Sequence, residues 1–198
     1  MVSKNITWHE GDIGYEHRCG LLGQRGAVLW LVGLSGSGKS TVAVAAEKSL
    51  TAAGRLCYRL DGDNVRCGLN SDLGFSPEER TENVRRVAHV ASLMRDAGLI
   101  VLVSFITPYA ALRKTARGII GADYFHEVYV KADIDTCKER DPKGLYEKAQ
   151  KGEIAEFTGV SAPFEEPKNP ALTLDTARHS IDASCEQLIQ YLSESNII

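Results

Sequence analysis

The chain has 198 residues, with 43% apolar and 25% charged side chains, values that suit one globular domain with a sizeable core. Its net charge of −3 offers no basic field for nucleic acid, and its apolar runs are too short to cross a bilayer. The opening residues lack the apolar segment of a signal peptide and the five cysteines form no C-x-x-C pair, so we expect reduced thiols, a cytoplasmic protein and no membrane partner.

Short strand-like runs alternate with helical patterns along the chain. Several of the runs are apolar on both faces, as strands inside a parallel sheet must be. We expect strands at 27–32, 56–60, 99–105, 127–130 and 171–174. We expect helices at 40–53, 77–97, 109–118, 134–140 and 180–193. This alternation predicts an α/β fold, a doubly wound parallel sheet with helices on both faces.

The first strand leads into GLSGSGKST at 33–41, which contains the full G-x-x-x-x-G-K-[ST] pattern of a P-loop. Glycines let backbone N–H groups approach phosphate oxygens, and the helix that follows points its positive end at the same phosphates. Lys39 can follow the transferred phosphoryl group with its charge, and the Ser40 hydroxyl can ligate Mg²⁺. The residues expected to contact the nucleotide are Gly33, Leu34, Ser35, Gly36, Ser37, Gly38, Lys39, Ser40 and Thr41.

Two carboxylates, Asp61 and Asp63, follow the second strand. Ligands of doubly wound sheets bind outside the carboxyl ends of the strands, so this turn is a candidate site. One carboxylate can hold Mg²⁺ through water, and the other can accept a proton from an attacking hydroxyl. The alternative is that an aspartate at such a turn caps the next helix.

The start of the next helix combines a structural signal with a binding signal. Ser76, followed by proline and by Glu79 three residues on, forms a capping box. Arg80 and Asn83 lie three apart on one helix face, just after Phe75. A cation, an amide and an aromatic ring would suit a small anionic nucleotide, although a solvated helix face explains Arg80 and Asn83 equally well.

Two later segments complete the candidate site. Thr107 precedes a proline at the end of the third strand, where it could contact an acceptor phosphate or merely start the next helix. Residues 141–168 break the alternation and are rich in proline, glycine and charge, which is typical of a lid or of disorder. Cations such as Arg140 and Lys143 could stabilise transferring phosphate when a lid shuts. We expect one P-loop kinase domain at 1–198, with an N-terminal arm at 1–26 and a lid at 141–168.

Taken together, these stretches resemble the adenylyl-sulfate kinase family, which phosphorylates adenosine 5′-phosphosulfate (APS) on its ribose 3′-hydroxyl to give 3′-phosphoadenosine 5′-phosphosulfate (PAPS) in sulfate assimilation. The matching stretches are NITWH (5–9), GLSGSGKST (33–41), LDGDNVR (60–66), LGFSPEERTENVRR (73–86), SFITPY (104–109), RDPKGLYEKA (140–149) and GEIAEFTGVSAPFEEP (152–167). The resemblance implies a five-stranded P-loop fold, ATP with Mg²⁺ as donor, and a homodimer. It also allows a functional association with ATP sulfurylase.

The resemblance also implies roles for single residues. Asp63 matches the proposed base at the 3′-hydroxyl, and Asp61 matches a group near Mg²⁺. The residues matching those that hold or line APS are Arg66, Phe75, Arg80, Asn83, Ile106, Thr107, Gly144, Leu145 and Phe164, with Phe75 and Phe164 sandwiching the adenine. Lys143 matches the lid lysine and Arg140 a residue near ATP. Thr107 stands where the family usually has serine, a position discussed as a phosphate acceptor; a threonine hydroxyl could still accept a phosphoryl group.

Three other functions compete with APS kinase activity. The first is a P-loop kinase for another small acceptor, such as a nucleoside, nucleotide or sugar acid. The second is a nucleotide-gated switch, although the sequence has no N-K-x-D motif for reading a guanine base. The third is a degenerate kinase domain that regulates a sulfurylase. Because Lys39, Ser40, Asp63 and Lys143 are all present, we favour the active APS kinase.

Overall fold

A computed structural model describes residues 5–7, 9 and 11–198, so part of the expected N-terminal arm and of its NITWH stretch lies outside the described residues. The strands are β1 (Ala27–Val32), β2 (Cys57–Asp61), β3 (Ile100–Ser104), β4 (Phe125–Lys131) and β5 (Leu172–Asp175). The helices are α1 (Tyr15–Leu22), α2 (Lys39–Ala52), α3 (Gly62–Arg66), α4 (Pro77–Asp96), α5 (Ala110–Ile120), α6 (Ile134–Arg140), α7 (Leu145–Gln150) and α8 (Ile181–Glu194).

The strands form one five-stranded parallel sheet in the order β2-β3-β1-β4-β5. β1 lies in the middle, with Leu29 opposite Leu102 of β3 and His126 of β4. Every residue of β1 is buried, because helices cover both faces of the sheet. The doubly wound α/β P-loop fold predicted from the alternation of elements is confirmed.

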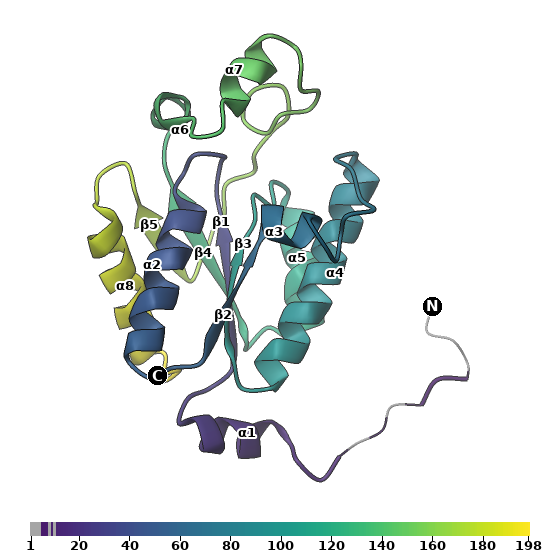
Figure 1. The fold of residues 1–198 in the computed structure, drawn as a ribbon, viewed down its shortest axis with the longest axis vertical. Coiled ribbons are helices and arrows are strands. Elements are labelled where there is room, and N and C mark those ends of the chain that lie inside the picture. The colour runs from purple at the N-terminus through teal and green to yellow at the C-terminus, as the bar shows by residue number, and fades with distance from the viewer. Residues whose placement is uncertain (1–4, 8, 10) are drawn as a thin grey trace.

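Two hydrophobic cores lie on opposite faces of the sheet. On one face, side chains of α2 and α8 such as Ala46 and Leu188 pack against the strands. On the other face, α4 and α5 supply residues such as Val87 and Ala116, which pack around Trp30. The carboxyl ends of all five strands meet at one edge of the sheet, and α6 and α7 lie beyond that edge (Figure 1).

A third, smaller core lies outside the sheet. It joins Ala132, Cys137, Tyr146 and Phe157, which come from α6, α7 and the segments beside them. Residues 145–157 of the expected lid therefore pack in a hydrophobic cluster that they share with α6. That this region opens and closes stays a prediction.

The expected elements agree with the structure to within about two residues at most ends. The short helices α1, α3 and α7 were not expected, because five to eight residues give too little periodicity to recognise. The end of β2 matters most for function, since the strand extends to Asp61 and places that carboxylate at the sheet edge. Among the described residues, no helix is long and apolar enough to cross a membrane. All five cysteines are free.

Candidate active site

The P-loop connects β1 to α2 through backbone that only glycine adopts easily. Gly36 and Gly38 have φ angles of 76° and 93°, in the left-handed region. A Cβ on Gly33 would lie 2.4 Å from the carbonyl oxygen of Val130, so that position has no room for a side chain. No side chain caps α2, which leaves its first N–H groups available to an anion.

Lys39 is folded back over this loop. Its side chain is 8% exposed, and Nζ donates to the carbonyl oxygens of Gly33 (2.9 Å) and Leu34 (2.7 Å). Burial lowers the pKa of Lys39 to about 8, because the charged form loses solvation. A phosphate group would replace carbonyl partners with negative charge and so stabilise the cation.

Three side chains from distant segments brace the P-loop. Arg140 donates to the carbonyl oxygens of Gly36 (3.4 Å) and Thr176 (2.6 Å), and the Thr176 hydroxyl donates to the Ser37 carbonyl (2.7 Å). The Tyr146 hydroxyl donates to the Ser35 carbonyl at 2.9 Å. The structure thus places Arg140 beside the P-loop, and its contact with ATP stays a prediction. Neither Thr176 nor Tyr146 was predicted as a site residue: Thr176 lies outside every quoted motif, and Tyr146 lies within RDPKGLYEKA without an assigned role.

Oxygen atoms from the ends of neighbouring elements converge next to the loop. The Ser40 hydroxyl donates to Asp61 Oδ2 (2.7 Å) and lies 3.1 Å from the Ser104 hydroxyl. The Asp61 carboxylate also accepts the Asp63 N–H at 3.1 Å, which caps α3, so the capping and ligand interpretations of Asp61 are compatible. Hydroxyl and carboxylate oxygens are the donors Mg²⁺ prefers, so Ser40 and Asp61 fit this ion. Ser104 was not predicted.

Asp63 forms an ion pair with Lys143 across the gap between α3 and the region before α7. Both side chains are more than half exposed. The pair therefore joins two of the predicted catalytic groups at the sheet edge while leaving both open to solvent. An exposed ion pair of this kind is weak, so an entering substrate can separate it at little cost.

An aromatic and cationic cluster lies at the start of α4. Phe75 is 63% exposed, with the guanidinium carbons of Arg66 and Arg80 at 4.3 and 5.7 Å from its ring centre. Arg66 is held by the carbonyl oxygens of Leu73 and Gly74, at 2.9 and 2.8 Å. An open aromatic face flanked by two cations is suited to a nucleotide base and its anionic groups.

Asn83 lies apart from this exposed face. It is 5% exposed, and its side-chain oxygen accepts from Asn70 Nδ2 at 2.8 Å. The solvated-face alternative is therefore wrong for Asn83. Arg80 is half-buried and donates to the carbonyl oxygens of Phe75 and Glu156. The capping box of Ser76 and Glu79 is confirmed.

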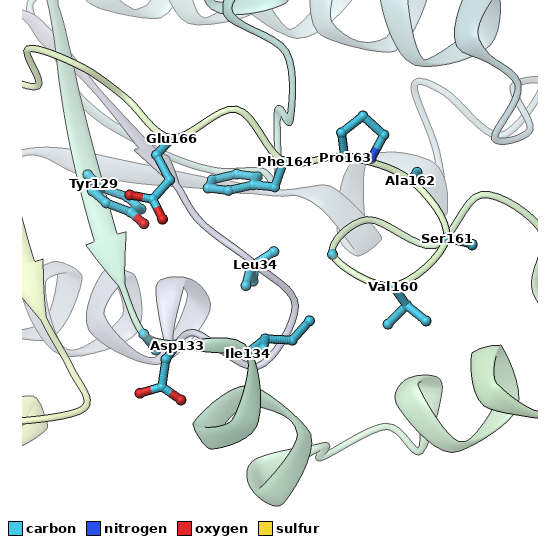
Figure 2. A pocket seen from close by; sticks show the side chains of 12 residues that line it. Leu34, Tyr129, Asp133, Ile134, Val160, Ser161, Ala162, Pro163, Phe164 and Glu166 are labelled. Carbon is cyan, nitrogen blue, oxygen red and sulfur yellow. The ribbon is translucent and has the colours of Figure 1, made fainter.

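A cavity of about 670 Å³ lies between β4, the P-loop and residues 159–166 (Figure 2). Its wall includes Leu34, Tyr129, Ile134, Val160 and Phe164. The Phe164 ring stacks against Tyr129 with ring centres 6.3 Å apart. Phe164 therefore contacts the ring of Tyr129, whereas Phe75 contacts guanidinium groups. In the described part of the chain no ring contact joins the two phenylalanines, and an adenine base held between them stays a prediction.

Thr107 is buried and its backbone is unusual. Its φ of 41° is rare for a β-branched residue, and its hydroxyl accepts a hydrogen bond from the Trp30 indole at 2.9 Å. At 3% exposure, this hydroxyl is poorly placed to accept a phosphoryl group, which favours a structural role for the side chain.

The remaining predicted pocket residues surround the same edge of the sheet. Ile106 is half-buried beside Thr107, and Gly144 is the N-cap of α7, with a φ of 64°. Leu145 packs against the small core beyond the sheet. Their contact with a substrate stays a prediction.

Comparison with known proteins gives extensive similarity. The family model described as adenylylsulphate kinase matches residues 25–175. An adenylyl-sulfate kinase of Staphylococcus epidermidis is 52% identical over 196 residues, covering 99% of this chain and 98% of that protein.

Solved structures agree with this result. The Mycobacterium tuberculosis APS kinase CysC, in complex with AMPPNP and APS, has a TM-score of 0.82 and 48% identity, covering 86% of this chain and 99% of that one. A hexameric APS kinase from Thiobacillus denitrificans has a TM-score of 0.66 and 31% identity, covering 88% of this chain and 30% of that one.

Proposed function

This chain belongs to the adenylylsulphate kinase family, and we propose that it transfers the γ-phosphoryl group of ATP to the 3′-hydroxyl of APS, giving PAPS and ADP. The observation that carries this function is the meeting of Ser40, Asp61 and Ser104 beside the P-loop, with Asp63 and Lys143 paired alongside. A donor cradle and an acceptor site therefore share one edge of the sheet.

In the proposed mechanism, the backbone N–H groups of the P-loop and Lys39 hold the β- and γ-phosphates of ATP. Ser40, and Asp61 through water, would hold Mg²⁺, which when bound neutralises phosphate charge. Asp63 orients the 3′-hydroxyl and accepts its proton for in-line attack. Lys39 and Lys143 stabilise the charge that spreads over the γ-phosphoryl oxygens, so catalysis rests on positioning and electrostatics.

The acceptor stage has its own residues in this proposal. Phe75 and Phe164 hold the adenine of APS, and Arg66 and Arg80 hold its charged groups. Support comes from the cations that flank the exposed Phe75 ring and from the position of Phe164 in the wall of the cavity beside the P-loop.

Turnover with purified protein tests the function directly. The chain is incubated with ATP, Mg²⁺ and either APS, AMP or gluconate, and the nucleotides are separated by anion-exchange chromatography. We expect PAPS and ADP in equal amounts from APS. Turnover of AMP or gluconate without turnover of APS would instead support a kinase for another small acceptor.

The Arg80→Ala substitution separates acceptor binding from donor binding. Arg80 lies beside Phe75 and donates to the carbonyl oxygens of Phe75 and Glu156 rather than to the P-loop. Its loss should therefore raise the KM for APS by about tenfold while changing the KM for ATP by less than about twofold. Steady-state kinetics with each nucleotide varied in turn provides the measurement. Equal changes in both KM values would remove Arg80 from the APS pocket.

Donor binding should also depend on pH through Lys39. Burial lowers the pKa of free Lys39 to about 8, and bound phosphate favours the cation and raises this pKa. Binding then takes up a proton above that pH, so ADP affinity should be constant below about pH 8 and fall by up to about tenfold per pH unit above it. Calorimetric titration with ADP tests this dependence, because ADP phosphates are already ionised in that range. The same slope in Lys39→Met would contradict the assignment.

Three wider properties complete the proposal. The chain works in the cytoplasm, it forms a homodimer, and it acts beside a sulfurylase that supplies APS. The hexameric Thiobacillus denitrificans relative supports association between subunits.

A further inference from the structure

The loop between β3 and α5 carries backbone strain beside the proposed acceptor site. Thr107 is one of three non-glycine residues with positive φ in the described structure, at 41°. Strained backbone persists only where its surroundings hold it. The contacts that hold Thr107 therefore show which residues set the shape of this loop.

Trp30 binds the Thr107 hydroxyl, and Arg113 binds the backbone of this residue. Arg113 Nη1 donates to the carbonyl oxygens of Thr107 (3.1 Å) and Pro108 (3.3 Å), and the side chain is 7% exposed. Its Nε lies 2.6 Å from Glu127 Oε1, on β4. Buried ion pairs add little net stability, because desolvating both charges offsets their attraction. The Arg113–Glu127 pair is therefore better explained by its effect on the geometry of the 106–108 loop than by its effect on stability.

The same loop also holds the segment that carries Phe164. The Pro108 carbonyl oxygen accepts the Glu165 N–H at 2.9 Å, and Glu165 Oε2 accepts the Ala110 N–H at 2.7 Å. Arg113 and Glu165 thus bind one carbonyl oxygen from two sides. A shift of the loop would move Ile106 and Phe164 together.

The donor side of the site has separate supports. Arg140, Thr176 and Tyr146 bind the P-loop carbonyl oxygens. Within the part of the chain that the structure describes, these three side chains form no hydrogen bond with Arg113 or with the loop at 106–110. Loss of Arg113 should therefore disturb the acceptor wall and leave the ATP cradle intact.

We propose that Arg113, paired with Glu127, is a positioning residue that sets the affinity for the acceptor nucleotide by fixing the 106–108 loop and the Phe164 segment docked on it. This inference rests on the proposed function. Arg113 touches neither substrate in this arrangement, and it acts through the carbonyl oxygens that it binds.

Paired variants separate positioning from simple stability. Arg113→Met leaves the carboxylate of Glu127, whose side chain is only 20% exposed, without its cation, so it should lower the melting temperature by roughly 10 °C. It should also raise the KM for APS by about tenfold or more, with the KM for ATP changed by less than about twofold. Arg113→Met combined with Glu127→Gln removes the unpaired charge, so the melting temperature should recover while the KM for APS stays high.

Two further variants complete the test. Arg113→Lys keeps a cation for Glu127 without the guanidinium fork and should give an intermediate KM for APS. Arg117→Met changes an exposed arginine on the same helix and should leave both KM values unchanged. Recovery of the APS KM together with stability in the double variant would overturn the inference, as would equal changes in both KM values. A wild-type chain that made no PAPS would instead overturn the proposed function, and this inference with it.

Discussion

Replacement of Lys39 by methionine should lower kcat/KM at least about 10³-fold, or about 4 kcal/mol of transition-state stabilisation. The reason is that Lys39 is the buried cation of the P-loop, and its two carbonyl partners offer no positive charge in its place. Methionine matches the length of the lysine stem. The melting temperature should not fall, because burial already disfavours the charged side chain.

Lys48→Met is the matched control, since Lys48 is an exposed lysine on the same helix. Steady-state assays and thermal melts of both variants decide the outcome. If Lys39→Met kept a tenth or more of the wild-type kcat/KM, an order of magnitude that one lost hydrogen bond could explain, Lys39 would not be the transition-state cation.

The second large effect is expected at Asp63. Asp63→Asn keeps the size of the side chain and removes the basic carboxylate, so kcat with APS should fall by about 10² to 10⁴. The KM for ATP should change little, because Asp63 is bound to Lys143 rather than to the P-loop. A fall in kcat of less than tenfold, or about 1.4 kcal/mol, would show that the base is another group.

The ion pair with Lys143 requires a separate control, because Asp63→Asn also removes the partner of that lysine. Lys143→Met breaks the same pair while keeping the carboxylate. If Asp63 is the base, kcat should fall further in Asp63→Asn than in Lys143→Met. Asp72→Asn, which changes an exposed carboxylate paired with Arg86, should behave as wild type.

Local pattern was sufficient to predict the sheet and the nucleotide loop. The run AVLWLV is apolar at every position, which only a strand covered on both faces requires, and the P-loop follows it directly. The capping box is likewise a local signal, because Ser76 and Glu79 lie three residues apart and form it without contacts from the rest of the fold.

Residues that meet only through the sheet could not be predicted in the same way. Ser104 lies opposite Asp61 because β2 pairs with β3 in one particular register, which neither strand specifies alone. Thr176 braces Ser37 across 139 residues of chain, and Tyr146 reaches Ser35 from the region beyond the sheet. Thr107 follows a strand that the sequence predicts, but its burial and its hydrogen bond with Trp30 on β1 depend on how β1 and β3 pack together.

The small core of Ala132, Cys137, Tyr146 and Phe157 is distinct from the two cores that hold the sheet together. Changes in its packing should therefore alter the local stability of α6, α7 and the segments beside them, without altering the packing of the two cores that hold the sheet. We expect substitutions in the small core to change kcat, and substitutions in the two sheet cores to change the melting temperature.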